Sequence, residues 1–366
     1  MESENNERCS TWNIFSNSAS IIIFTGVIQS IVGIWQFVIQ KSIGLTWLKE
    51  SILSPDISGV AKVVFGGEKY IRAYGLFPHP NILGGFLVLS ITLTLAFLKP
   101  FNLLKNLKNS KNEENMINPS QNVPRGTFNG TNLELQKNNI CSTWNIWLDY
   151  FILGIQLLAL FLTFSKSAWI GVTIALAYVL IRNVPRGTLR RISEKNFKYF
   201  ALIGGIIILL IFLVKPDWHS IAGKSIDDRI FYLNVSRGTF FENPVFGVGS
   251  GQFVLNLETI ENIQEWQFQP VHNVFLLILN ELGIIGLCLF VWFVRKMIRN
   301  VPRGTFLTNN YLSAIFFGFL FIMLFDHYFW DIQQGQIMLW FVLGLLSGGK
   351  MWTSKKFNTY PQDKAK

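Results

Sequence analysis

Apolar residues gather in eight runs along the chain, and polar segments separate them. A bilayer core needs about 20 apolar residues per helix, and these runs suit that role although four are short. Charged residues with Trp or Tyr flank the short runs, as expected of helix ends anchored at lipid headgroups. The predicted spans are Ile21–Gln40, Ile82–Leu98, Trp147–Phe164, Ala168–Val184, Tyr199–Val214, Val274–Val294, Tyr311–Phe325 and Ile332–Leu346.

Composition supports this pattern. The chain of 366 residues is 50% hydrophobic and 15% charged, whereas soluble domains carry roughly 25% charged residues. We therefore expect an all-α polytopic membrane protein with about eight transmembrane helices and two long extracytoplasmic loops, 41–81 and 215–273. The transmembrane domain would cover 21–346, with a cytoplasmic N-terminus at 1–20 and a cytoplasmic tail at 347–366.

Basic residues predict the orientation. One alternating set of segments, which includes both termini, holds 22 of the 32 Lys and Arg residues. By the positive-inside rule this set is cytoplasmic, so the net charge of +10 reflects topology and no bound nucleic acid is expected. All four histidines fall on the opposite, outer set, where any chemistry should lie: His79, His219, His272 and His327.

Two hexapeptides recur at irregular spacing. Both back-translate to one self-complementary DNA sequence read in different frames, so we interpret them as translated copies of a DNA palindrome rather than a protein repeat. All copies fall in predicted cytoplasmic segments, where insertions are tolerated. They are Asn122–Thr127, Asn183–Thr188, Asn300–Thr305, Cys9–Ile14 and Cys141–Ile146.

The first outer loop and the following hairpin carry candidate cations. Arg72 and His79 lie in a turn rich in Pro and Gly that ends at Asn81, just before the second span. Lys166 lies at the tip between the third and fourth spans. The alternatives are an arginine snorkelling to lipid phosphate and a lysine anchoring a helix at the interface.

The second outer loop holds further candidates. Arg229 precedes a glycine-rich stretch with Gly247 and Gly249, whose backbone could approach a ligand or the membrane surface. No GK[ST] follows these glycines, so a nucleotide site is poorly supported. His272 and Asn273 come directly before the sixth span.

Glu281 lies inside that sixth span. An ionisable side chain in a membrane is costly and suggests function, although it could equally pair with Asn280 or with a neighbouring helix.

The order of these motifs resembles the O-antigen ligase family, which includes O-antigen polymerases and protein O-oligosaccharyltransferases. The resemblance covers about Ile21–Leu346, and it rests on four motifs in order. These are Arg-x-x-Gly-x-x-x-x-Pro-Asn from Arg72, Thr-Phe-Ser-Lys ending at Lys166, Arg229 followed by Asn-Pro-x-x-Gly-Val-Gly, and His-Asn-x-x-Leu-x-x-x-x-Glu-x-Gly from His272.

The resemblance implies a glycosyltransferase of the bacterial inner membrane that uses an undecaprenyl-diphosphate-linked glycan. Arg72, Arg229 and Lys166 would contact the diphosphate, with Lys166 in place of a more usual arginine, and His272 would be catalytic. We add Glu281 as a second catalytic candidate, and expect Asn81 and the glycines to support the loops.

Chemistry agrees with these roles. Arginines stabilise negative charge on a leaving diphosphate, and a histidine can take a proton from an acceptor hydroxyl near neutral pH. No cofactor is expected, and no metal, because the outer histidines and carboxylates lack ligand spacing.

Other functions stay open. A lipid-linked glycan transporter or flippase could have the same number of spans, but it should place ionisable residues near the midplane rather than in outer loops. Sequence alone does not separate a ligase from a polymerase or a protein-glycosylating enzyme. The glycan and the acceptor, whether glycolipid, glycan or protein, stay equally open.

Overall fold

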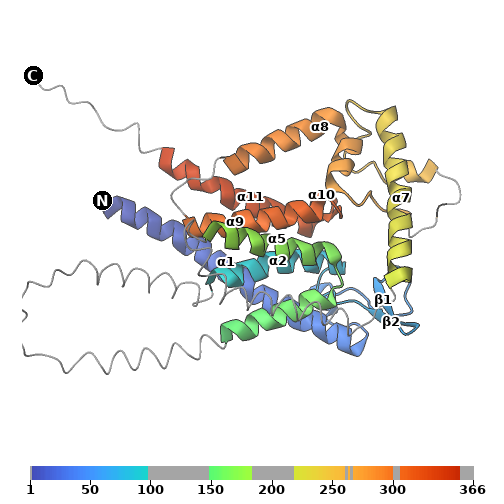
Figure 1. The fold of residues 1–366 in the computed structure, drawn as a ribbon, viewed down its shortest axis with the longest axis horizontal. Helices are drawn as coiled ribbons and strands as arrows, with labels where there is room; N and C mark the ends of the chain where they lie inside the picture. Colours follow the sequence, from blue (N-terminus) through green and yellow to red (C-terminus); the bar gives the residue numbers. More distant parts are fainter. Residues whose placement is uncertain are drawn as a thin grey trace, which may run out of the picture.

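The computed structural model describes residues 2–97, 148–183, 218–259, 263, 267–299 and 306–354. Helices dominate this part of the chain, and most of the long ones run side by side (Figure 1). They are α1 (Glu2–Ile39), α2 (Pro80–Phe97), an unlabelled helix over Leu148–Leu162, α5 (Lys166–Asn183), α7 (Trp218–Glu242), α8 (Val274–Arg299), α9 (Phe306–Met323), α10 (Tyr328–Asp331) and α11 (Gln333–Ser354).

Helices occupy seven of the eight predicted span positions. The remaining position, Tyr199–Val214, lies outside the described residues. Within the described part, three helices are long and apolar enough to cross a bilayer: Asn17–Ile39, Pro80–Phe97 and Val274–Ile298. The membrane character is therefore supported, while the count of eight spans stays a prediction.

Helix α2 lies at the centre of the bundle, where it contacts α1, α5, α9 and α11. Residues 82–94 of this helix are buried all round, as expected for a helix that is apolar on every face. Its polar side chains bond to the 148–162 helix. Gln156 Nε2 donates to Ser90 Oγ, and Thr94 Oγ1 donates to Gln156 Oε1, both at 3.1 Å. Such bonds hold helices together where lipid supplies no hydrophobic drive.

The first long loop contains a β-hairpin, so the expectation of a purely helical fold was wrong in this detail. Strands β1 (Lys62–Phe65) and β2 (Glu68–Ile71) pair antiparallel. Gly66 and Gly67 form the two-residue turn with φ of 58° and 88°, a backbone that glycine adopts readily. The signal was present as Gly-Gly between β-branched and aromatic residues.

The second long loop contains α7, which the sequence analysis did not separate from it. Figure 1 shows α7 standing across one end of the bundle, beside the hairpin. Over residues 227–242 of α7, for which burial is described, Tyr232, Ser236 and Thr239 are buried, and their spacing of four and three residues defines one narrow face. Charged and other polar residues interrupt the apolar residues of α7, so it lacks the long apolar run that marks the other helices. Helix α1 begins and α11 ends at the opposite end of the bundle (Figure 1).

Candidate active site

Arg72 follows β2 and is fixed inside the protein. Its Nε donates to Thr163 O at 2.5 Å, and its Nη2 donates to Asn81 Oδ1 at 2.6 Å. Burial lowers the pKa of the Arg72 guanidinium to about 10, so the group stays charged at neutral pH. Arg72 therefore joins two loops of the bundle end instead of extending toward lipid.

Asn81 extends this connection to a residue that the sequence analysis missed. Its Nδ2 donates to Asp326 Oδ2 at 2.7 Å. Asp326 is 5% exposed and lies between α9 and α10, far away in sequence. The residue lies next to His327 near the end of a predicted span, and that Asp-His pair on the outer face was the available signal.

His79 caps the start of α2. Its Nδ1 accepts the Asn81 backbone N–H at 3.2 Å, and its carbonyl accepts the N–H of Ile82 at 3.0 Å. Pro80 occupies the first helical position, where a missing N–H has no cost. Burial lowers the pKa of His79 to about 3, and the nearby Arg72 charge acts in the same direction. His79 is therefore neutral, with one ring nitrogen already used by the backbone.

Three cations from three elements converge at this end of the bundle. Lys166 begins α5 and is exposed, and the charges of Arg229 and Arg72 lie close enough to repel its ammonium group. Arg229 comes from α7. Its Nη2 donates to the backbone oxygen of Phe325 at 3.4 Å, and its guanidinium lies 5.7 Å from the centroid of the Phe325 ring. Like charges held together favour a site for an anion.

The segment carrying His272 is held by its neighbour Asn273. Asn273 Oδ1 accepts the Leu276 N–H at 3.0 Å, which caps the first turn of α8. Its Nδ2 donates to Leu324 O, also at 3.0 Å, and so ties the start of α8 to the end of α9. Asn273 thus fixes the segment next to His272 through both ends of its side-chain amide.

The His272 imidazole packs between two rings. Its centroid lies 5.5 Å from that of Tyr232 and 5.2 Å from that of His327, which stands at 85° to it. Within the described part of the chain, its Nδ1 is buried without a hydrogen-bond partner. Burial lowers the pKa of His272 to about 4, with the neighbouring His327 acting in the same direction and Asp326 opposing it.

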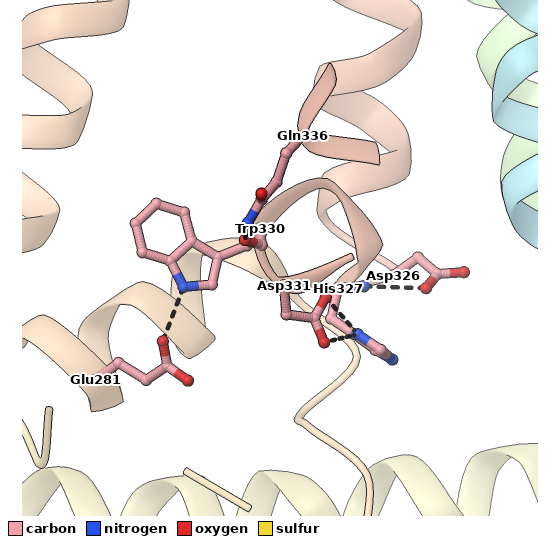
Figure 2. Close-up of polar contacts among 6 residues, drawn as sticks. All are labelled: Glu281, Asp326, His327, Trp330, Asp331 and Gln336. Atoms are coloured by element: carbon pink, nitrogen blue, oxygen red, sulfur yellow. Dashed lines mark hydrogen bonds and ion pairs between the residues drawn. The ribbon is translucent and has the colours of Figure 1, made fainter. Parts of the chain in front are cut away.

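His327 was grouped with the outer histidines but not selected as a site residue. Figure 2 shows its Nδ1 against both carboxylate oxygens of Asp331, at 2.9 and 2.8 Å. Burial lowers the pKa of His327, but the hydrogen bond and charge of Asp331, together with the charge of Asp326, outweigh it and raise the pKa above its usual value. The pKa values of the adjacent His272 and His327 imidazoles are thus shifted in opposite directions.

The glycine-rich stretch, residues 243–251, packs against α8 where that helix is broken. The helix is interrupted at Gly283, where φ is 65° and ψ is −170°. The carbonyls of Asn280 and Glu281 accept the N–H groups of Val248 and Gly249 at 2.9 and 2.8 Å. In return, the N–H groups after the break donate to the carbonyls of residues 244 and 245. The backbone bonds that α8 loses are therefore replaced by the loop.

The glycines make this insertion possible. A Cβ on Gly247 would lie 2.4 Å from the carbonyl carbon of Glu281, and one on Gly283 would lie 2.1 Å from Val245 O. Gly247 has φ of 70°, and Gly249 has φ of 108°. The backbone approach predicted for this stretch is thus made to a helix.

Glu281 also binds through its side chain. Its Oε2 accepts the indole N–H of Trp330 at 2.8 Å, and the residue is 4% exposed. Figure 2 shows Trp330 reaching toward Glu281 from one side of α10, while Asp331 and His327 lie together elsewhere on that turn. Of the alternatives raised by the sequence, pairing with a neighbouring helix is the one that this contact favours.

Comparison with protein families supplies an independent result. The family model described as O-antigen ligase matches residues 150–291. This segment matches the O-antigen ligase family. The resemblance found from the ordered motifs is thereby confirmed. A search of curated proteins finds no match.

The O-antigen ligase match includes Lys166, Arg229 and His272, whereas Arg72 lies before it and His327 after it. At the level of the family, the match indicates glycosyl transfer at a membrane. The structure brings residues from inside and outside the matched segment to one end of the bundle.

An apolar cavity of about 300 Å³ lies among α8, α9 and α11 of the bundle. That volume is at the lower end of the range for small-molecule sites. The cavity extends from near the start of α8, close to His272, to Arg295 and Ile298 toward its other end. Its lining residues are Phe275, Phe290, Val291, Val294, Arg295, Ile298, Phe316, Leu320, Met323 and Leu339.

Proposed function

We propose that the protein transfers a glycan from an undecaprenyl-diphosphate-linked donor to an acceptor hydroxyl on the extracytoplasmic face of the bacterial inner membrane. The observation that carries this proposal is the convergence of Arg72, Lys166 and Arg229 at the bundle end that holds His272. Negative charge grows on the diphosphate as its bond to the anomeric carbon breaks. Charged hydrogen-bond donors fixed in advance stabilise that charge.

His272 is the proposed base. At neutral pH its low pKa leaves the imidazole uncharged, so a ring nitrogen can accept the proton of the acceptor hydroxyl. The acceptor oxygen bonds to the anomeric carbon, and the C–O bond to the diphosphate breaks with its electron pair going to the leaving group. The proton on His272 is released afterwards.

Support for the reacting groups comes from the surrounding contacts. Asn81 orients Arg72, and Asn273 fixes the segment before α8. We assign Glu281 to positioning, because its carboxylate faces Trp330 and its carbonyl holds the Gly249 N–H. Transfer would then need no metal and should persist in a chelator.

The apolar cavity supports a lipid-linked donor. Its walls are almost entirely apolar side chains of α8, α9 and α11, and Phe275 places one end near His272. A polyprenyl chain bound there would leave its diphosphate beside the three cations. The hydrophobic effect would then contribute to donor binding in addition to charge.

The test is transfer by the purified full chain in lipid nanodiscs, supplied with an undecaprenyl-diphosphate-linked glycan and candidate acceptors. We expect product from the wild type and from Arg237→Ala, an exposed arginine further along α7. His272→Ala should lose transfer by roughly a hundredfold or more, the usual scale for a general base. Full activity of His272→Ala would refute the base, and donor carried across the bilayer without transfer would favour the transporter alternative.

A further inference from the structure

The proposed reaction leaves a proton on His272, and the structure offers a second imidazole beside it. We propose that His327, held by Asp331, receives this proton from His272 and passes it to solvent. The inference deepens the proposed function and rests on it. His327 and Asp331 come from the segment between α9 and α11, outside the matched family segment.

The contact with Asp331 makes Nε2 the acceptor nitrogen of His327. Its Nδ1 faces both oxygens of Asp331, at 2.9 and 2.8 Å (Figure 2). A carboxylate accepts hydrogen bonds, so Nδ1 carries the hydrogen and Nε2 keeps a lone pair. The centroids of the two imidazoles lie 5.2 Å apart. One bridging water or a small ring rotation can connect imidazoles at that separation.

His272 is poorly suited to keeping the proton. Within the described residues its Nδ1 is buried with no hydrogen-bond partner. An imidazolium at this position would hold a buried N–H that nothing accepts, which is unfavourable. His327 differs because Asp331 already accepts its N–H and balances a positive charge.

The His327–Asp331 pair is also in contact with water. Their side chains are 13% and 26% exposed. A proton placed on Nε2 makes His327 an imidazolium beside the Asp331 carboxylate, and it can then leave to water. His272 returns to its neutral form, ready for the next acceptor hydroxyl.

Electrostatics act in the same direction. Asp331 and Asp326 face His327 from its own segment, His272 faces it from the segment before α8, and His79 from the turn before α2. Asp331 and Asp326 outweigh burial and raise the pKa of His327. Burial and the neighbouring His327 lower the pKa of His272 to about 4. A proton therefore moves to the group with the higher affinity for it.

The sign of the pH dependence follows from this difference. His327 must be neutral to receive a proton, so turnover should fall as the pH drops through the raised pKa of His327. Removing the negative charge of Asp331 lowers that pKa, and the acid limb of the profile should then move to lower pH. A role limited to packing would reduce the rate without moving the limb.

The experiment measures glycan transfer by the full chain in nanodiscs from about pH 4.5 to 9. The variants are Asp331→Asn, Asp331→Glu, His327→Gln and, as a control of the same chemistry, Asp56→Asn at an exposed carboxylate. We expect Asp331→Asn to turn over about tenfold slower at pH 7. The acid limb of its pH–rate profile should lie roughly one pH unit or more below that of the wild type. Asp331→Glu should restore the limb of the wild type, and Asp56→Asn should match the wild type throughout.

His327→Gln keeps the inference testable if Asp331→Asn fails to fold. It should be at least about tenfold slower at pH 7, with a limb set by His272 alone. An unshifted limb in both variants, or full turnover of His327→Gln at every pH, would overturn the inference while leaving the transfer reaction intact. If the wild type transfers no glycan, it is the proposed function that fails.

Discussion

Adding one methyl group at Gly247 should release the loop that is inserted into α8. The new Cβ would lie 2.4 Å from the carbonyl carbon of Glu281 and 2.5 Å from Asn280 O, both backbone atoms that cannot turn aside. The residue also has φ of 70°, which costs a non-glycine residue about 1–2 kcal/mol. Relief of the contact requires the loop to move away from the helix.

The magnitude follows from the bonds that such a movement breaks. Four backbone hydrogen bonds join the loop to α8, two in each direction. At roughly 0.5–1.5 kcal/mol each, their loss and the backbone strain amount to about 3–8 kcal/mol. The loop is bonded to α8, and His272 comes directly before α8. Donor binding and transfer should therefore weaken as well.

The assay is thermal unfolding of Gly247→Ala in detergent, compared with Gly154→Ala. A Cβ on Gly154 would meet nothing within 4 Å, and alanine is favoured over glycine in a helix by about 0.5–1 kcal/mol. We expect the midpoint of Gly247→Ala to be lower by about 10 °C or more. Midpoints that agree within about two degrees would refute the inserted loop as a source of stability.

Three further predictions follow from the structure. A reporter that functions only in the cytoplasm should be active when fused after Lys198 and silent after Glu265; activity at the second position would reverse the proposed orientation. Glu281→Gln keeps an acceptor for the Trp330 indole, so transfer should stay within about fivefold of the wild type, while Glu281→Ala should lose about 1–3 kcal/mol of stability; a dead but folded Glu281→Gln would make the carboxylate catalytic. Leu320→Trp should fill the apolar cavity and raise the KM for a polyprenyl donor with little change for a short-chain analogue; equal effects on both donors would argue against the cavity as the site of the lipid chain.

Much of the fold follows from hydrophobic runs because each long apolar run in the described residues forms one helix. Helix α2 illustrates this, since a continuous apolar run from Ile82 is buried as a unit. Helix α7 was missed for the opposite reason. Its described buried residues form a narrow face that includes Tyr232 and Ser236, and its apolar residues are interrupted by charged ones, so a search for long apolar runs does not find it.

The candidate site likewise contains residues that the sequence predicted and residues that only the structure revealed. Arg72, Lys166 and Arg229 lie on separate elements, and the ordered motifs predicted them as site residues before their proximity was known. Asp326 and His327 became visible only once α9 and α10 had brought them to the start of α2 and α8. Such contacts join residues more than 50 positions apart, and no spacing rule along one element reports them.

The most direct test of the proposed mechanism separates binding of the diphosphate from the proton transfer. The measurement is the Kd of undecaprenyl diphosphate for the full chain in nanodiscs, in the wild type, His272→Ala, Arg229→Ala and the α7 control Arg237→Ala. We predict a Kd near that of the wild type for His272→Ala and Arg237→Ala, although His272→Ala should transfer glycan slower by roughly a hundredfold or more. Arg229→Ala should raise the Kd roughly tenfold to a hundredfold, because a charged hydrogen bond contributes about 1.5–3 kcal/mol. A wild-type Kd in Arg229→Ala, or an equal loss of affinity in His272→Ala, would contradict the division of the site into diphosphate-binding cations and a proton-accepting histidine.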